Sequence, residues 1–520
     1  MTLSKQNTAH ASDVTRSDER ISALLEHVQR ISDLNVLGSL AEWDQNTILP
    51  DGAGEVRGAQ QATLQGIVHD QWSKPELGKL INELRDASQE GWSDADKGLI
   101  REVVRSYDQA TKLPRDLVEE LARVGAGSFE AWRRARDKSD FASFAPWLTR
   151  TVALQREVAD RYGYKESRYD ALLDLYEPGL TVSRVDALFA PVRETSTQLL
   201  HQIQASGQSI DASCLEGDFA PEEQIKLADK ILRGMGYDFS RGYMAVSPHP
   251  FTSSFGSPHD VRVTVNPDRY LMQACLMAAI HEGGHALYEQ GVSPNLTRTP
   301  LASGASMGAH ESQSRLWENA IGRSEAYWRG QFKHVQSSFP DQFGHIDVVT
   351  FMRALNQVKP SLIRIEADEV TYNLHIIIRY ELEREMVNGN VAIESMPGMW
   401  NAKYREYLGV EPQNDAEGIL QDVHWSSGFG YFPTYTLGNL YAAQIFQALK
   451  TAFPDFDSRL ADGDTSFILS WLQERMYSSG STYLPEALIK RVTGEAPDPT
   501  YFATYLKNKF GALYGLSLNS

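Results

Sequence analysis

His281-Glu282-Gly283-Gly284-His285 continues an apolar, helix-prone stretch, Leu271–Ile280, and a change to Ser, Thr, Gly and Pro after Gln290 ends the helix. On an α-helix, residues four apart share one face about a turn apart, so both imidazoles can bind one zinc ion. Glu282 is displaced around the helix, where its carboxylate can reach a metal-held water without being a ligand. The stretch therefore predicts a helix with two zinc ligands and a general base.

A third ligand is expected from the next helix-like stretch, which opens with His310-Glu311-Ser312-Gln313-Ser314-Arg315. The carboxylate of Glu311 would complete a His₂Glu set and leave the fourth position for water, as a catalytic zinc site requires. His310 and Glu318 are the competing ligands; His310 would face elsewhere if Glu311 faces the metal. The expected reaction is metal-assisted amide hydrolysis, in which Glu282 accepts a proton from water and delivers one to the departing amine.

The rest of the chain is patterned mainly for helices. Apolar residues at helical spacing form one stripe at Ile21, Leu24, Leu25, Val28 and Ile31. Comparable patterns predict helices over Leu117–Ala135, Phe144–Tyr162, Val182–Ala205, Pro221–Met235 and Thr371–Val387. Alternating residues in Val261–Val265, preceded by Tyr243–Val246, predict a small antiparallel sheet beside the metal helix. The expected fold is mainly α.

Composition excludes several classes of function. The net charge of −18 argues against a nucleic-acid partner, which would need a basic face. Only two cysteines are present, which is typical of a reducing compartment. Met1–Arg20 lacks an apolar signal sequence, and no apolar run is long enough to span a bilayer. We expect a soluble cytoplasmic protein with a flexible tail over residues 1–17. The remaining residues, 18–520, are expected to form one catalytic domain, which could consist of two helical lobes on either side of a groove.

Short motifs in a fixed order carry a family resemblance. They are Trp43-Asp44-Gln45, His249-Pro250-Phe251, Asp260-Val261-Arg262-Val263-Thr264, His281–His285, His310-Glu311-Ser312-Gln313, Ile363-Arg364-Ile365-Glu366-Ala367-Asp368, Gly418-Ile419-Leu420-Gln421-Asp422-Val423-His424-Trp425 and Arg491-Val492-Thr493-Gly494-Glu495. From about residue 20 to its end, the chain resembles the carboxypeptidase Taq family of thermostable metallocarboxypeptidases, related in fold to the neurolysin and angiotensin-converting-enzyme group.

The resemblance implies an elongated helical body cut by a deep groove with the metal at its floor, usually as a homodimer. It also implies release of single residues from the carboxyl end of peptides, with broad side-chain tolerance. The expected cofactor is one Zn²⁺ per chain, for which Co²⁺ can substitute. The alternative is a zinc oligoendopeptidase or a dipeptidyl-releasing peptidase, because HExxH plus Glu suits an endopeptidase equally. A non-catalytic peptide-binding protein is disfavoured, since a structural site has no need of Glu282.

A carboxypeptidase must recognise a terminal carboxylate, which a planar guanidinium binds in a two-pronged way. Arg364 and Arg262 are the candidates for this contact. Arg364 has apolar neighbours in the sequence, and its alternative role is an ion pair with Asp368, four residues later on the same helix face. Arg262 could instead point to water from its short strand.

Further site residues are expected in the Gly- and Tyr-rich turn over residues 426–435, which follows His424. His and Tyr donors can stabilise a tetrahedral oxyanion, and the turn resembles the His and Tyr loop of the neurolysin group, with different spacing. Tyr435 is slightly favoured over Tyr431 for the oxyanion. The substrate-binding candidates are His249, Gln421 and Tyr431, although the tyrosines could pack the loop and His249 could be structural.

The carboxylates near the motifs have two kinds of expected role. Asp368 and Asp422 are candidates for orienting a zinc-bound imidazole, a contact that such ligands usually have. Glu289, Glu366 and Glu369 are expected to be solvated charges on helix faces.

Overall fold

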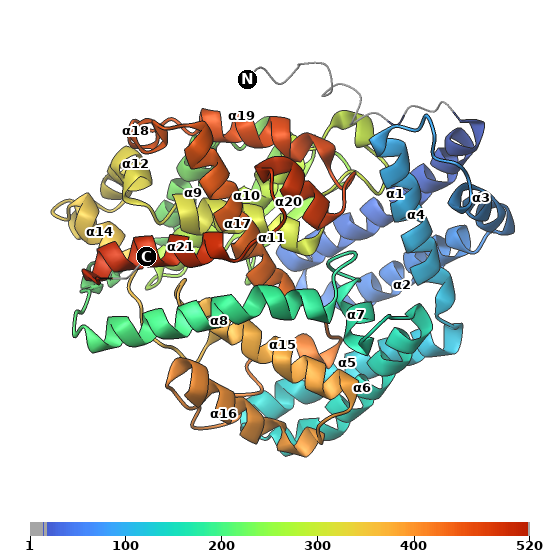
Figure 1. Cartoon of the computed structure of the whole chain (residues 1–520), viewed down its shortest axis with the longest axis horizontal. Helices are drawn as coiled ribbons and strands as arrows, with labels where there is room; N and C mark the ends of the chain where they lie inside the picture. The colour runs from blue at the N-terminus through green and yellow to red at the C-terminus, as the bar shows by residue number, and fades with distance from the viewer. Residues whose placement is uncertain (1–13, 15–17, 518–520) are drawn as a thin grey trace. The chain divides into compact units, whose positions relative to one another are not determined.

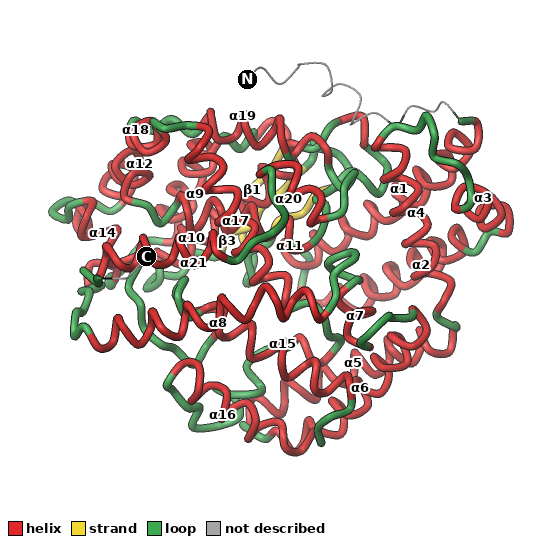
Figure 2. The backbone as a smooth tube through the Cα atoms, viewed as in Figure 1, coloured by secondary structure: helices red, strands yellow, loops and turns green. Residues whose placement is uncertain are grey.

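The computed structural model describes Val14 and residues 18–517. The expected tail over residues 1–17 lies outside the described residues except for Val14. Helices dominate the described chain and strands form one small patch, as Figure 2 shows, so the prediction of a mainly α fold is confirmed. No helix in the described part is both long and apolar enough to cross a membrane.

The chain divides into two compact units, each assembled from three separate segments. Unit 1 comprises Met1–Thr111, Ala212–Leu355 and Ile445–Ala496, and unit 2 comprises Lys112–Asp211, Asn356–Gln444 and Pro497–Ser520.

Unit 1 contains the predicted metal helix and the sheet. Its helices are α1 (Glu19–Thr47), α2 (Gly54–Trp72), α3 (Pro75–Arg85), α4 (Asp94–Lys112), α9 (Pro221–Met235), α10 (Met272–Gly291), α11 (Met307–Arg315), α12 (Glu325–Ser338), α13 (Pro340–Phe343), α14 (Val348–Leu355), α18 (Phe456–Ala461), α19 (Ser466–Arg475) and α20 (Pro485–Thr493). Its strands are β1 (Gly242–Val246), β2 (Thr252–Ser254) and β3 (Val261–Val265). A π-helix, η5 (Leu316–Ile321), continues α11.

The sheet lies against α10, as expected, but it is mixed rather than antiparallel. The strand order is β1-β3-β2, in which β1 pairs with β3 in parallel and β2 pairs with β3 antiparallel. The short strand β2 was not predicted. The alternation of residues reports which face of a strand is buried and carries no information on the direction of its neighbour. The prediction of an antiparallel sheet was therefore wrong for one of its two pairings.

The described residues of unit 2 form helices joined by loops, with no strand among them. Its helices are α5 (Arg115–Lys138), α6 (Phe141–Tyr162), α7 (Arg168–Leu173), α8 (Val182–Ala205), α15 (Tyr372–Asn388), α16 (Met396–Leu408) and α21 (Thr500–Tyr514), together with the first part of α17 (Pro433–Ala452). α15 lies beside α8 and α16 (Figure 1). All thirteen buried residues of α15 lie within Tyr372–Val387, so this helix forms much of the core of the unit.

The predicted helices are all present, and two have the expected bounds. α9 begins with Pro221, whose fixed φ suits the first helical position, and ends before Gly236 at a φ of 99°. α8 is capped by Thr181, whose hydroxyl accepts from the backbone N–H of Arg184. These local signals are visible in the sequence, which explains the agreement.

Candidate metal centre

The first requirement of the site is that α10 and α11 approach closely. α10 is buried along most of its length and packs against α9, α11 and β3. A Cβ atom at Gly284 would lie 2.5 Å from the backbone oxygen of Gln313 and 2.8 Å from the Cα of Ser314. Only glycine allows this approach, which brings Glu311 within reach of the two histidines. The second Gly of the segment is therefore a functional residue that the sequence analysis did not recognise.

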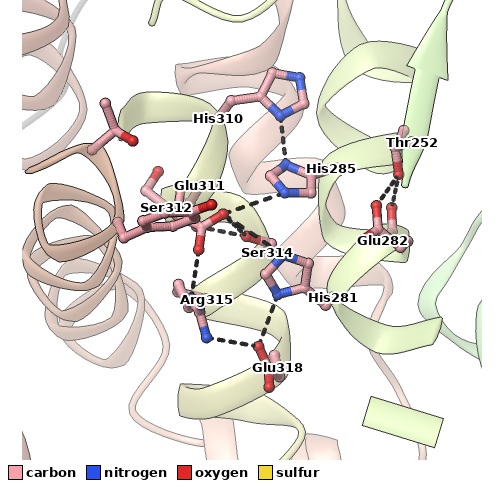
Figure 3. Close-up of polar contacts among 12 residues, drawn as sticks. Thr252, His281, Glu282, His285, His310, Glu311, Ser312, Ser314, Arg315 and Glu318 are labelled. Atoms are coloured by element: carbon pink, nitrogen blue, oxygen red, sulfur yellow. Dashed lines mark hydrogen bonds and ion pairs between the residues drawn. The ribbon is translucent and has the colours of Figure 1, made fainter. Parts of the chain in front are cut away.

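His281, His285 and Glu311 converge in one place, as Figure 3 shows. The Oε2 atom of Glu311 lies 3.7 Å from Nε2 of His281 and 3.5 Å from Nε2 of His285. Bonds of about 2.0–2.2 Å to a tetrahedral zinc ion would place its ligand atoms about 3.3–3.6 Å apart. The three donor atoms therefore fit a divalent ion of this kind, with Glu311 as the carboxylate closest to both Nε2 atoms.

Glu318, a competing ligand in the sequence analysis, instead contacts the far side of His281. Its Oε2 lies 2.8 Å from Nδ1 of His281, and it also pairs with Arg315 at 3.2 Å. Burial opposes its ionisation, but Arg315 and His281 outweigh burial and lower the pKa of Glu318 to about 2. An ionised carboxylate at Nδ1 places the imidazole proton there and leaves Nε2 free to bind a metal.

Arg315 also supports Glu311, because its Nε lies 2.6 Å from Oε1 of that carboxylate. Burial raises the cost of the Glu311 charge, yet Arg315 and the two imidazoles hold the pKa of Glu311 well below its ordinary value. Burial also lowers the pKa of His285 to about 3. The ligand set is thus one anion and a neutral His285, the states that a metal ion requires.

His310, the other competing ligand, lies on the side of His285 that faces away from His281 (Figure 3). The two Nδ1 atoms are 2.5 Å apart, and Nε2 of His310 lies 2.7 Å from Oε1 of Glu289. Glu289 is 2% exposed and also accepts from Ser303. The expectation that Glu289 is a solvated charge was therefore wrong: periodicity placed it on a helix face but could not show that the residues around 303–310 cover that face.

Glu282 lies beside the three donor atoms and is not one of them. The hydroxyl of Thr252, on β2, lies 2.7 Å from Oε2 of Glu282 and 2.9 Å from its backbone oxygen. Burial raises the pKa of the Glu282 carboxyl. A carboxylate that is held in place and has a raised pKa is suited to accept a proton and return it.

In unit 2, Asp422 is the centre of an ion-pair cluster. Its Oδ1 lies 2.8 Å from Nη2 of Arg364 and its Oδ2 lies 2.6 Å from Nε of Arg379. Both arginines are buried, and burial opposes the charge of Asp422 while the two guanidinium groups hold its pKa well below the ordinary range. Two positive groups share one carboxylate, so the cluster keeps a positive excess. Gln421 braces it, since its Oε1 accepts from Arg379 at 2.7 Å.

Asp368, the alternative ion-pair partner of Arg364, has a different role. Arg364 lies in a single 3-10 turn rather than in a helix shared with Asp368. The carboxylate of Asp368 accepts from Val370 and Thr371, just before α15, and from the backbone of Lys359. Asp368 and Asp422 contact other residues of unit 2. Glu318 and His310 contact the imidazoles of His281 and His285 within unit 1.

Two of the three expected solvated charges are buried. Besides Glu289, Glu369 is 8% exposed and accepts from the Tyr505 hydroxyl at 2.7 Å. Glu366 is exposed, as expected.

His424, Tyr431 and Tyr435 form one aromatic group in unit 2. The His424 ring centroid lies 5.8 Å from that of Tyr431 and 6.5 Å from that of Tyr435. Burial lowers the pKa of His424 to about 4, so the imidazole is neutral near pH 7. The guanidinium of Arg364 lies 5.2 Å from the Tyr435 ring centroid. The structure thus brings Arg364 together with three candidates from the distant stretch 424–435.

Arg262 and His249 lie in unit 1. Arg262 is paired with Asp260 through two contacts of 2.8 Å and lies over the ring of Trp43. Its guanidinium therefore already has a carboxylate partner. His249 is exposed and lines a pocket with Thr252, the partner of Glu282.

Comparisons with known proteins agree with this geometry. Residues 23–510 match the family described as carboxypeptidase Taq (M32) metallopeptidase. The chain is 40% identical to carboxypeptidase 1 of Bacillus subtilis over 488 aligned residues. The alignment covers 94% of this chain and 97% of that relative. The chain is also 40% identical over 507 residues to thermostable carboxypeptidase 1 of Thermus thermophilus, with 95% and 98% covered. The crystal structure of an M32 carboxypeptidase from Deinococcus radiodurans R1 matches with a TM-score of 0.92 at 37% identity, with 96% and 100% covered.

Proposed function

The chain belongs to the carboxypeptidase Taq (M32) family and is a metallocarboxypeptidase, and from that premise we propose that it uses zinc, with Glu282 as the general base. The observation that carries the proposal is the convergence of two Nε2 atoms and one Glu311 oxygen beside a non-ligand carboxylate. Its substrates are peptides with a free carboxyl end, from which it releases single residues with broad side-chain tolerance.

His281, His285 and Glu311 would hold the metal. When bound, the ion supplies a Lewis acid that acidifies water and polarises a carbonyl group. Glu318 keeps the proton of His281 on Nδ1, and the pair of His310 and Glu289 orients His285 in the same way. These contacts fix both rings, so little reorganisation is needed when the metal binds.

Glu282 moves the protons of the reaction. Its carboxylate accepts a proton from the attacking water and delivers it to the nitrogen of the leaving residue. Thr252 holds one carboxylate oxygen at 2.7 Å and leaves the other available for this transfer. Because burial raises the pKa of the Glu282 carboxyl, the carboxylate binds the transferred proton more tightly and can hold it until it passes to the leaving nitrogen.

The remaining roles are assigned by chemistry. Arg364 is proposed to bind the terminal carboxylate, because its cluster with Arg379 and Asp422 keeps a positive excess. Arg262 is the weaker candidate, since Asp260 already occupies its guanidinium.

Tyr435 and His424 are proposed to donate to the oxyanion, with Tyr431 and His249 contacting the substrate and Gln421 bracing Arg364. We also propose that the chain assembles as a homodimer, as the resemblance to the family implies.

Mass spectrometry of a free-ended peptide over time tests the proposal. We expect a ladder that loses one carboxy-terminal residue per step, abolished by 1,10-phenanthroline and restored by zinc or cobalt. The same peptide with an amidated carboxyl end should resist cleavage. Efficient internal cleavage of the amidated peptide would contradict the exopeptidase assignment and favour an oligopeptidase, and loss of two residues per step would indicate a dipeptidyl-releasing enzyme.

A further inference from the structure

Two pockets of unit 1 adjoin along α1, and together they are called the α1 groove. The larger has a volume of about 710 Å³ and is lined by residues of α1 and α2, including Gln61 and Gln65. The other has a volume of about 540 Å³ and is lined by α1 and by Ser247–Ser254. Ser39, Glu42 and Asn46 line both pockets, so the two lie next to each other along α1.

One end of the α1 groove lies at Thr252, which directly contacts the catalytic helix. Thr252 lines the second pocket, and its hydroxyl lies 2.7 Å from Oε2 of Glu282. A molecule in the groove would therefore extend from Thr252, the residue that contacts the proposed general base, towards the α1–α2 hairpin. All of these residues lie in unit 1.

The lining of the α1 groove is rich in amide groups. Asn35, Gln45, Asn46, Gln61 and Gln65 all line the larger pocket. An amide side chain offers both donors and an acceptor, the same set that a peptide main chain needs. Such side chains can bind an extended backbone without selecting its side chains, which suits a peptidase of broad tolerance.

The charge of the groove lining indicates which end of a peptide substrate it can bind. Among the described residues, no lysine or arginine lines either pocket, and Glu42 lies at their junction as an exposed carboxylate. A terminal carboxylate would be repelled there, whereas an ammonium or guanidinium group would be attracted. The groove is also far larger than a single released residue requires.

We infer that the α1 groove binds the part of the peptide substrate upstream of the scissile bond, with main-chain contacts from the amides and a cation-selective position at Glu42. This inference rests on the proposed function, because it takes Glu282 as the point of cleavage.

The groove has a defined length and a fixed width. Asn35 and Asn46 are eleven residues apart on α1, a rise of about 17 Å. An extended peptide covers that distance with about five residues. Arg57 of α2 clasps α1, since its Nη1 lies 2.6 Å from Asp44 and 2.7 Å from the backbone oxygen of Ala41. The two helices are thereby held at a set separation.

The test measures release of the last residue from acetylated peptides of two to eight residues that share one carboxy-terminal sequence. Each longer peptide is made with Lys, Gln or Glu at each of the third to sixth positions from the carboxyl end. In the wild type, we expect kcat/KM to rise with length and then level off. At the position that meets Glu42, Lys should exceed Glu by about threefold, the range of an exposed ion pair.

The variants separate the two contacts. Glu42→Gln should bring the Lys-to-Glu ratio close to one, and Glu42→Lys should invert it. Gln61→Ala with Gln65→Ala should reduce the gain from length. Glu26→Gln, the same charge change on an exposed part of α1 outside both pockets, should keep the wild-type ratios.

The possible failures are distinct. If no peptide of any length loses its last residue, the proposed function is wrong and the inference falls with it. If last residues are released but the Glu42 and Gln61/Gln65 variants keep the wild-type dependence on charge and length, only the inference is overturned. The same holds if those variants change the mass of the protein in solution and not these ratios, because the groove would then be covered by a second copy.

Discussion

At the scale of single residues, two carboxylates on neighbouring helical segments have different tasks. Glu311 faces the Nε2 atoms of His281 and His285, whereas Glu318 meets Nδ1 of His281. Both have lowered pKa values, and Arg315 contacts both. The difference lies in position, since η5 is a π-helix that follows α11 directly and π-helices are frequent at functional sites. Residue type alone could not have separated a ligand from its supporting group.

Glu318→Gln should weaken zinc binding while leaving the three ligands in place. The amide can still accept from Nδ1 of His281 but loses the charge, and removing such a supporting contact typically costs about 10–100-fold in metal affinity. Competition with a chromophoric chelator measures the zinc Kd. Glu325→Gln, which removes a charge from an exposed pair with Arg329, is the matched control. Equal zinc affinity in the two variants would contradict the orienting role.

Glu282→Gln should separate metal binding from hydrolysis. Glu282 is not among the three donor atoms, so zinc content per chain should equal that of the wild type. Loss of the general base should reduce kcat by about 10²–10⁴-fold. Zinc content is measured by elemental analysis on the same sample used for kinetics. Turnover close to wild type in a zinc-loaded variant would refute the proposed base.

At the scale of elements, the buried side chain of Glu383, on α15, holds the turn between His424 and α17 by hydrogen bonds. Its carboxylate accepts from Nε1 of Trp425 at 2.8 Å, from the backbone N–H of Gly430 at 3.0 Å and from the Tyr169 hydroxyl. Gly430 has a φ of 95°, and a Cβ there would lie 2.5 Å from the backbone oxygen of Leu172. The turn that carries the proposed oxyanion donors is therefore anchored by a buried acid and a required glycine.

Glu383 should make stability depend on pH. Burial raises the pKa of Glu383 to about 7, above the value of about 4.3 for an unfolded chain. The folded state thus binds the proton more tightly, so this stabilisation is complete below about pH 4 and is lost as the pH rises to 7. Relative to Glu383→Gln, which does not titrate, the wild type should lose about 2–3 kcal/mol between pH 5 and pH 8.

Urea unfolding of both proteins at the two pH values, followed by tryptophan fluorescence, measures this change. The absolute free energy of unfolding of the variant does not decide the question. The NH₂ group that Glu383→Gln introduces would face the N–H donor of Trp425 or Gly430, and this mismatch is itself destabilising at every pH. A constant difference between the two proteins across the pH range would contradict a raised pKa.

At the scale of the whole molecule, local signals predicted more than long-range ones. The helix ends at Pro221, Gly236 and Thr181 have chemical causes within a few residues, so α8 and α9 were predicted with their bounds. The ligand spacing in His281–His285 is local in the same way.

Features set by distant segments were missed. The parallel pairing of β1 with β3, the burial of Glu289 by residues 303–310 and the pairing of Arg364 with Asp422 all join parts of the chain whose proximity no periodicity reports. The contact between α10 and α11 at Gly284 belongs to the same class.

Metal binding should stabilise the folded molecule because its ligands come from α10 and α11, which meet only when unit 1 is folded. Free zinc at 100 times its Kd contributes about 2.7 kcal/mol, which for a molecule of this size raises the Tm by about 2–4 °C. Calorimetry of the chelated and reloaded protein measures the shift. Glu311→Ala should have a Tm that no longer responds to zinc. Two results would mean that the ion does not bind at these ligands: a wild-type Tm that does not change with zinc, or an equal rise of the Tm in the variant. By mass action, zinc stabilises the folded protein only through the residues that bind it, so loss of a ligand must reduce the rise.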